Sequence, residues 1–538
     1  MKRVPLFALF LACLASSAIA QTETAKGVVY DDANGNGARD PGERGVSGVL
    51  VSNGMDIVKT DRGGNYQVPV SEDAIVFVIK PRGWMNPVGP GDSVPRFYHI
   101  HKPGGSPEMR HAGVPPTGPL PASIDFPLRR QKEGKRFKVL CMGDTQTRNV
   151  DEVQFLANGL LAELHGTDAV FGIVLGDNVF DDLSVFAPLV ETMGGLGIPW
   201  RHVPGNHDHN HDAPTAAATD DTFERFFGPS HYSFNYGPVH FIVLNNIRHN
   251  VGKDGYHGGL GERQLAFLRN DLAHVSPGQL VVLLMHIPVM SLDDTRALYE
   301  TLKDFPHTLS LSAHTHNQRH EFIGAADGWK GKTPHHHIVH GTACGSWWGG
   351  NLDEAGIPIA QMSDGGPRNY SLISFNGAKY DVEFRVPGRP ADYQMSLWLP
   401  ERIPAARSAG TEVVANVFAG SEKSRVEMRV EGSGKWTAMA RFTGQDPHLV
   451  RALGRQDAFL AKVAELRGVT EIDKAFAGQA HRDFNMITRR LSGPADTGHL
   501  WRAALPAGLA PGSHVVTVRT TDMFGRSYSA ARMFVVTE

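Results

Sequence analysis

The sequence predicts an α/β domain flanked by two mainly β-sandwich domains, because its residue pattern changes twice along the chain. The chain has 538 residues, more than one ordinary domain of about 150 residues would use. Residues 25–130 contain short β-rich apolar runs between turns of Gly, Asn and Asp. Residues 135–380 alternate apolar strands with helical periodicity, which favours an α/β layer structure. Residues 385–538 return to β-patterns around a helix-compatible insertion near residues 447–490.

The composition excludes broad disorder and gives no electrostatic support for a nucleic-acid partner. Hydrophobic residues make up 41% of the chain and charged residues 20%, so the chain can bury cores. The net charge is −3 and the pI is about 6.8, and no stripe of Lys and Arg with interleaved aromatic residues is present. Of the 26 histidines, 18 lie between His202 and His340. Histidine that dense in one region indicates metal or acid–base chemistry.

The first twenty residues have the pattern of a secretory signal peptide. Two basic residues precede an apolar run that ends in Ala18-Ile19-Ala20, which predicts cleavage before Gln21 and a periplasmic or secreted protein. No other stretch has about 18 uninterrupted apolar residues, so no stable membrane span is expected after cleavage. The remaining cysteines are Cys141 and Cys344, which we expect to be two buried thiols rather than a disulfide framework.

A loop in the first β region has the residue spacing of a calcium-binding loop. Asp32, Asn34, Asn36 and Asp40 offer oxygen atoms at intervals, and Glu43 occupies the twelfth position. No helices flank this loop, so the same pattern also fits a solvated turn rich in Asp and Asn. The sequence leaves both interpretations open, with any calcium ion in a structural role.

Five apolar strand patterns in the α/β region each end in residues able to bind a metal. These residues are Asp144 with Gln146, Asp177, Asn206, His286, and His314 with His316. In an α/β sheet, ligands collect outside the carboxyl ends of the strands, so these residues are expected to converge on one crevice. Nitrogen and oxygen donors without thiolate suit Mn, Fe, Zn, Co or Mg. His207 follows Asn206 directly, and Asp208 beside it is a candidate to orient that histidine for catalysis.

The ordered motifs Gly-Asp-Thr-Gln, Gly-Asp-Asn-Val, Gly-Asn-His-Asp, Met-His and Ala-His-Thr-His resemble those of the calcineurin-like metallophosphoesterase superfamily. The resemblance covers roughly residues 135–380, and the flanking β regions resemble those of a bacterial exported subgroup. It implies a four-layer α/β/β/α sandwich. It also implies a phosphoric ester hydrolase with a dinuclear metal centre, in which a metal-bridged hydroxide attacks phosphate monoesters or diesters.

The resemblance also implies a role for each motif residue. Asp144 and His316 would hold the first metal, Asp177 would bridge both metals, and the second would be held by Asn206, His286 and His314. His207 would protonate the leaving oxygen or stabilise the transferred phosphoryl group. The family's first motif usually reads Asp-x-His, whereas this chain has Gln146 in place of that histidine. An amide oxygen is a weaker ligand than imidazole, so the first metal is expected to be looser or to be Mn or Mg.

Other conspicuous residues have less specific interpretations. His209 extends the Gly-Asn-His-Asp loop and could touch the substrate or be an exposed loop histidine. Trp347 and Trp348 could wall the substrate cleft or pack at a domain interface. Tyr256 is placed on a loop near the cleft. His335–His337 are expected to be structural, because alternate residues of a strand face opposite sides and cannot converge.

Three classes of function compete. A phosphoesterase acting on a small-molecule or lipid phosphoester accounts for all five motifs. A non-catalytic module that binds glycan or protein through a degenerate metal site has only Gln146 as motif-level support. A nuclease is disfavoured because a basic stripe is lacking. The motifs do not report the substrate, the preference for monoesters or diesters, the metal identity or the oligomeric state.

Overall fold

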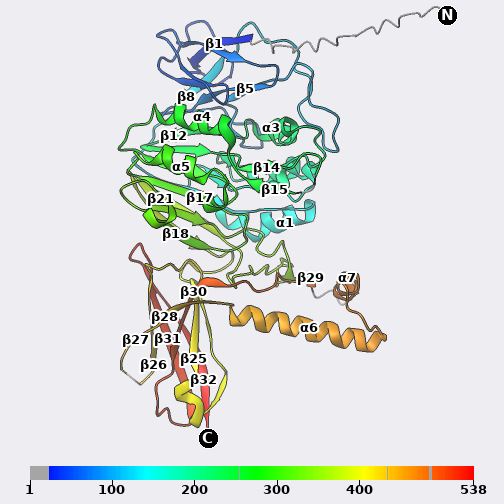
Figure 1. Cartoon of the computed structure of the whole chain (residues 1–538), viewed down its shortest axis with the longest axis vertical. Coiled ribbons are helices and arrows are strands. Elements are labelled where there is room, and N and C mark those ends of the chain that lie inside the picture. Colours follow the sequence, from blue (N-terminus) through cyan, green and yellow to red (C-terminus); the bar gives the residue numbers. More distant parts are fainter. Residues whose placement is uncertain (1–22, 254, 433, 484–486) are drawn as a thin grey trace, which may run out of the picture.

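A computed structural model describes residues 23–253, 255–432, 434–483 and 487–538, arranged as three regions along one long axis (Figure 1). The predicted signal peptide, residues 1–20, lies outside the described residues. Figure 1 places a β domain at the N-terminal end, an α/β domain in the middle and a second β domain at the C-terminal end. Within the described part of the chain, no helix has the length and apolar character needed to cross a membrane.

The N-terminal domain consists of two four-stranded sheets, ordered β4-β1-β8-β6 and β3-β2-β5-β7. Its strands are β1 (Glu23–Asp31), β2 (Leu50–Ser52), β3 (Ile57–Lys59), β4 (Asn65–Val70), β5 (Ala74–Ile79), β6 (Trp84–Met85), β7 (Tyr98–His101) and β8 (Phe126–Arg130). Strand β5 is buried on both faces. Its Val76 and Val78 pack inside this domain, whereas Phe77 and Ile79 pack into the core of the α/β domain. Because successive side chains of a strand point to opposite faces, β5 contributes to the cores of both domains and connects them.

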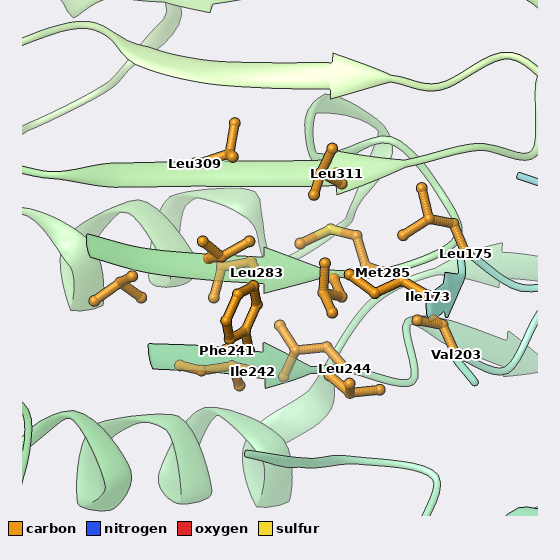
Figure 2. Close-up of a cluster of buried hydrophobic side chains, with 14 of the residues drawn as sticks. Ile173, Leu175, Val203, Phe241, Ile242, Leu244, Leu283, Met285, Leu309 and Leu311 are labelled. Atoms are coloured by element: carbon orange, nitrogen blue, oxygen red, sulfur yellow. The ribbon is translucent and has the colours of Figure 1, made fainter. Parts of the chain in front are cut away.

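The central domain contains two sheets packed face to face, ordered β11-β10-β9-β21-β22 and β12-β13-β16-β17-β19-β18. Their strands are β9 (Arg136–Met142), β10 (Gly172–Val174), β11 (Trp200–His202), β12 (Tyr232–Tyr236), β13 (Val239–Val243), β16 (Leu280–Leu284), β17 (Thr308–Ser312), β18 (Arg319–Ile323), β19 (His335–Val339), β21 (Tyr370–Asn376) and β22 (Lys379–Arg385). Figure 2 shows the apolar side chains that fill the space between the sheets, with Ile173 and Leu175 from one and Leu283 and Leu311 from the other. Within each sheet the strands that precede the metal motifs are parallel, so these motifs follow strands that run in one direction.

Helices cover the outer face of each sheet. Helices α1 (Val150–Gly159) and α2 (Phe186–Gly194) pack on the first sheet, and α4 (Gly261–Leu272) and α5 (Thr295–Leu302) pack on the second. The domain also contains α3 (Asp221–Phe227), a hairpin of β14 (Ile247–His249) and β15 (Tyr256–Gly258), and the short strand β20 (Gly350–Asn351). Its 3-10 helices are η1 (Leu161–Leu164), η2 (Leu183–Val185), η3 (Asn206–Asp208), η4 (Ala216–Ala218), η5 (Val289–Ser291) and η6 (Ala325–Asp327). The layer order is therefore helix, sheet, sheet, helix, which confirms the four-layer prediction.

The C-terminal domain is a β-sandwich with a helical arm. Its sheets are ordered β23-β25-β30-β28 and β24-β32-β31-β26-β27, with an apolar core between them. The strands are β23 (Met395–Trp398), β24 (Arg402–Pro404), β25 (Glu412–Val417), β26 (Arg425–Val430), β27 (Thr437–Ala438), β28 (Ala440–Gly444), β30 (Thr497–Ala504), β31 (Gly512–Thr521) and β32 (Ser527–Thr537). The arm, formed by α6 (Pro447–Arg467) and α7 (Lys474–Asp483), projects sideways in Figure 1. Strand β29 (Ile487–Arg489) follows the arm and pairs with β20 of the central domain.

Candidate metal centre

The motif residues lie on short loops that directly follow the parallel strands. Asp144 follows β9, Asp177 follows β10, Asn206 follows β11, His286 follows β16, and His314 follows β17. Several of these residues have a left-handed backbone: φ is 34° at Asp144, 48° at Asp177 and 69° at His314. Such a conformation costs about 1–3 kcal/mol per residue and persists only where the surrounding structure enforces it. The surrounding structure therefore holds these residues in strained backbone conformations that direct their side chains toward the same site.

Four side chains converge on a common point. Ligand atoms of Asp177, His286 and His314 all lie within 4.8 Å of one another. His286 Nε2 lies 3.3 Å from Asp177 Oδ2 and 3.1 Å from Asn206 Oδ1. His314 Nδ1 lies 3.1 Å from His286 Nε2. A cation at the centre of this group would be within reach of two imidazoles, a carboxylate and an amide oxygen, which is a suitable donor set for a divalent transition metal.

Asp144, Gln146 and His316 form a looser second group. Asp144 Oδ1 is buried without a hydrogen-bond partner and lies 3.7 Å from His316 Nε2. Gln146 donates from Nε2 to Asp177 Oδ2 at 3.0 Å, and its Oε1 lies 3.5 Å from the thiol of Cys344. A buried carboxylate oxygen without a partner is costly, and a bound cation would satisfy it. The residues present therefore fit a second metal ion next to the first.

Backbone carbonyls orient two of the histidines. His286 Nδ1 lies 2.8 Å from the carbonyl oxygen of Leu175, and His316 Nδ1 lies 2.6 Å from that of Gly345. When Nδ1 donates to a carbonyl, the other ring nitrogen, Nε2, remains available as a metal ligand. In both residues Nε2 is the nitrogen that faces the site.

A carboxylate from outside the motifs connects the His314–His316 loop to the C-terminal domain. Asp364 Oδ2 accepts a hydrogen bond from the backbone N–H of Gln318 at 2.7 Å, two residues after His316. The same oxygen lies 3.2 Å from Nε2 of His499, which belongs to β30. All three side chains are buried. The position of this loop therefore depends on a residue of the C-terminal sandwich.

The buried charges of the site are poorly balanced by protein groups alone. Burial raises the pKa of Asp144 well above its ordinary value. Burial acts to lower the pKa of His286, but the charge of Asp177 outweighs it and raises this pKa to about 9. Burial lowers the pKa of His314 to about 3 and that of His316 to about 4. Two neutral imidazoles beside buried carboxylates are in the protonation state that metal binding requires.

His207 is oriented by Asp181. Its Nδ1 lies 2.6 Å from Asp181 Oδ1, its backbone N–H donates to Asp177 Oδ1 at 3.0 Å, and its ring stacks on Phe180 with 4.2 Å between centroids. Burial acts to lower the pKa of His207, but the hydrogen bond with Asp181 and the charge of Asp177 outweigh it and raise this pKa. The histidine is therefore biased towards its protonated form beside the candidate metal ligands.

Asp208 does not orient His207, which corrects the sequence-based prediction. Its carboxylate accepts hydrogen bonds from the backbone and side-chain nitrogens of Asn178 and from the backbone N–H of Gly205. Asp208 therefore connects the loop that follows Asp177 to the loop that precedes Asn206. Asp181, which takes the predicted role, was missed. The available signal was the pair of carboxylates that begins four residues after Asp177.

His209 is buried rather than exposed. It is 1% exposed, both its ring nitrogens are without a hydrogen-bond partner, and its ring centroid lies 4.8 Å from that of His249. Burial lowers the pKa of His209 well below its ordinary value. The expectation of an exposed loop histidine is therefore wrong, and contact with a substrate stays a prediction.

The two tryptophans have different surroundings. Trp348 is buried, its Nε1 donates to the carbonyl oxygen of Thr145 at 3.0 Å, and its ring packs against Phe155 of α1. It belongs to the interior of the central domain and neither walls a cleft nor fills a domain interface. Trp347 is half-buried, with its ring centroid 4.4 Å from that of His316. The ring of Tyr256, on the β14–β15 hairpin, lies with its centroid 5.9 Å from that of His314 and remains partly exposed.

The other sequence-predicted groups lie outside this centre. His335 Nε2 and His337 Nδ1 both lie 2.6 Å from Ser310 Oγ, whereas His336 lies 2.7 Å from the hydroxyl of Tyr380. The three histidines thus alternate between faces of β19 and hydrogen-bond within the protein. Cys141 and Cys344 are free, buried thiols, as predicted.

In the candidate calcium loop, the amide nitrogens of Asn34 and Asn36 donate to Asp40 Oδ2 at 2.7 and 2.8 Å. Asp32 accepts backbone N–H groups, as does Glu43. Calcium binding there stays a prediction.

Comparison with known proteins identifies the type of protein. The family model for the calcineurin-like phosphoesterase domain matches residues 137–318. The model for the N-terminal region of calcineurin-like phosphoesterases matches residues 33–112, and the model for their C-terminal region matches residues 337–528. A four-layer sandwich with metal ligands at its strand ends defines a metal-dependent phosphoesterase fold. The chain belongs to the calcineurin-like phosphoesterase family, whose members are metal-dependent.

One solved structure that the chain matches is the purple acid phosphatase PPD1 isolated from yellow lupin (Lupinus luteus) seeds. It matches with a TM-score of 0.33 and 12% sequence identity, over 68% of this chain and 67% of that chain. No curated protein matches the sequence.

Proposed function

We propose that the protein is an exported phosphoesterase with a dinuclear metal centre that hydrolyses phosphate monoesters or diesters. The observation that carries this proposal is the convergence of candidate ligand atoms from separate strand ends. Those of Asp177, His286 and His314 lie within 4.8 Å of one another, and Asp144 Oδ1 is buried without a hydrogen-bond partner. Export is supported by the signal-peptide pattern of residues 1–20.

The two metal positions would be held by different residues. Asp177, Asn206, His286 and His314 would hold one ion, and Asp144, His316 and the shared Asp177 would hold the other. Gln146 would be a weak additional ligand only after its amide turns by half a rotation, because its Nε2 faces Asp177 and its Oε1 faces Cys344. When bound, divalent cations would act as Lewis acids that polarise the phosphoryl group and activate water. The donor atoms are nitrogen and oxygen only, which supports Mn, Fe, Zn or Mg rather than a soft metal.

His207 would supply a proton to the leaving oxygen. Its Nδ1 is held by Asp181, so its Nε2 is the nitrogen free to face a substrate. The raised pKa of this histidine, caused by the hydrogen bond with Asp181 against the effect of burial, favours the protonated form that a general acid needs. The same positive charge would stabilise the transferred phosphoryl group.

Two aromatic side chains flank the proposed site and would contact the group esterified to the phosphate. Trp347 lies against His316 on one side, and Tyr256 lies beside His314 on the other. Two aromatic rings beside candidate metal ligands support an ester with a planar or apolar group, including a small aromatic or lipid phosphoester, over a fully polar one.

Activity measurements with metal analysis test the proposal. The purified chain lacking residues 1–20 would be loaded with Mn, Fe, Zn or Mg and assayed with chromogenic phosphomonoesters and phosphodiesters. We expect turnover with at least one metal, close to two ions per chain, and loss of turnover in Asp177→Asn with the fold retained. Absence of both turnover and bound metal would instead support a non-catalytic module. Export would be tested by comparing the periplasmic fraction of cells expressing the full chain with that of cells expressing the chain without residues 1–20.

A further inference from the structure

A buried arginine lies where the N-terminal domain covers one edge of the central sandwich. Arg201, on the edge strand β11, is 5% exposed. Its guanidinium lies 4.4 Å from the ring centroid of Phe234, 5.2 Å from that of Phe97 and 5.9 Å from that of Tyr232. Phe97 comes from the N-terminal domain, and the other two rings come from β12. The arginine is therefore enclosed at an interface between two domains, away from the strand ends that carry the metal motifs.

This enclosed region has more positive than negative charge. Lys80 is also 5% exposed, and its Nζ donates to Glu133 Oε1 at 2.6 Å. Glu133 also accepts the backbone N–H of Gly237 at 2.8 Å. Among the described ion pairs, none links Arg201 to a carboxylate. The carboxylate of Glu133 therefore pairs with Lys80, whereas Arg201 has no carboxylate partner among the described ion pairs.

The effect of this charge imbalance is visible at Lys80. Burial lowers the pKa of Lys80 to about 8, although Glu133 acts to raise it, and the nearby charge of Arg201 adds to the lowering. Burial also lowers the pKa of Arg201. Arg201 also has a hydrogen bond with the hydroxyl group of Tyr232. A neutral hydroxyl and aromatic faces carry no net charge, so no described side chain supplies a counter-charge to Arg201.

A small cavity borders this arginine. Its volume is about 30 Å³, and it is lined by Lys80, Asn86 and Arg201 together with mainly apolar side chains. Within it, Nη1 of Arg201 and Oδ1 of Asn86 are both buried without a hydrogen-bond partner. Turning the Asn86 amide by half a rotation keeps its shape and presents Nδ2 as a second donor. The cavity thus offers two polar groups with no partner in a space for about one water-sized particle.

We infer that this cavity binds one small monovalent anion, of the halide class, between the guanidinium of Arg201 and the amide of Asn86. A water molecule would satisfy Nη1 but would leave the charge of Arg201 without compensation. The apolar remainder of the lining suits an anion that sheds its hydration readily. A bound anion would fix the N-terminal domain to β11, the strand that leads to Asn206 and His207.

Thermal unfolding of the chain lacking residues 1–20 tests this inference without any assay of activity. The melting temperature would be measured in sodium gluconate, with chloride or bromide replacing gluconate at constant ionic strength. We expect a saturable rise of roughly 2–4 °C with either halide, and no such rise with sulfate. Arg201→Gln should remove the halide dependence. The control Arg225→Gln, which removes an exposed arginine that also lies on a phenylalanine ring, should retain it.

A second variant and a second measurement keep the test decisive if Arg201→Gln does not fold. Asn86→Asp places a carboxylate of the same shape beside Arg201, so it should make the melting temperature insensitive to halide. Crystals grown in sodium bromide should show anomalous scattering in the cavity between residues 86 and 201. A rise in melting temperature that does not saturate and is equal in Asn86→Asp, together with a cavity that lacks anomalous signal, would show that only water binds there.

Discussion

The two halves of the candidate metal centre differ in how closely their ligands are arranged. Around His286, the donor atoms of Asp177, Asn206 and His314 lie within 3.3 Å of its Nε2. Around Asp144, the nearest histidine nitrogen is 3.7 Å away, and one carboxylate oxygen has no hydrogen-bond partner. The first half is nearly assembled by the protein alone, whereas the second half needs a cation to complete it. The difference teaches that the departure from the family's usual first motif, Gln146 in place of a histidine, lies in the looser half of the site.

The largest effect is expected from Asp177→Asn, because this carboxylate belongs to both halves. Replacing it removes the shared charge and should lower kcat/KM by more than about 100-fold, the upper range for loss of a partner outside the ligand set. Metal content should fall at both positions. Elemental analysis together with phosphoesterase kinetics would check this. Retention of one full equivalent of metal would show that one of the two halves binds its ion without Asp177.

The second-largest loss of activity is expected from replacing His207, which lies near the candidate metal ligands but is not one of them. His207→Asn should lower kcat by about 10²–10⁴-fold, the usual contribution of a general acid, while leaving the metal content unchanged. An equal loss of metal in this variant would contradict a role in proton transfer.

Asp181→Asn should change the pH dependence more than the maximal rate. The hydrogen bond with Asp181 raises the pKa of His207 against the lowering effect of burial, so the proton is retained to a higher pH than in an ordinary histidine. Activity that requires this proton falls as the pH rises through that pKa. Removing the Asp181 charge lowers the pKa, so the alkaline limb of the kcat profile should move to lower pH. An unchanged alkaline limb would exclude Asp181 as the partner that tunes His207.

A gain rather than a loss is expected from Gln146→His. Imidazole is a better ligand than an amide oxygen for Mn, Fe or Zn, so the looser half should bind metal about 10-fold more tightly or better, in line with the sensitivity of metal sites to single ligand changes. Competition with a chelator would resolve the two affinities. If Gln146→His changed the metal affinity of the tighter position only, Gln146 would not belong to the looser metal position. Gln146→Asn, which keeps the amide but shortens it, serves as the control.

The smallest effect on catalysis is expected at the tryptophan pair. Trp347→Ala should raise KM several-fold with little loss of stability, because this ring lies half-buried against His316. Trp348→Ala should destabilise the central domain by about 3–5 kcal/mol, as expected for removing a buried aromatic side chain. Chemical denaturation and KM measurements on both variants would separate the two roles. Equal destabilisation by both substitutions would show that Trp347 is also structural.

Sequence alone predicted the architecture and the converging ligands because these depend on local patterns. An apolar strand that ends in Asp144 or His286 specifies both the sheet and the sheet edge at which the side chain lies. Strand alternation also indicated that His335 and His336 face opposite sides. Such inferences need only the period of a strand and the direction of its neighbours.

The remaining features depend on packing between segments that are distant in sequence. Asp181 reaches His207 only because its loop has a left-handed backbone, with φ of 59°, which no short motif indicates. Trp348 and Trp347 are adjacent and both have a positive φ, yet one is buried against α1 and the other is half-buried. The burial of His209 likewise depends on His249 of the β14–β15 hairpin.

The hydrogen bonds of Asp364 set an order of events for the maturation of this protein. Asp364 holds the backbone that follows His316 and also lies against His499, which is separated from His316 by more than a third of the chain. During synthesis or transport across a membrane, the segment bearing His314 and His316 therefore emerges long before the residue that helps to fix it. The metal position that uses His316 should reach its full affinity only after most of the chain has folded.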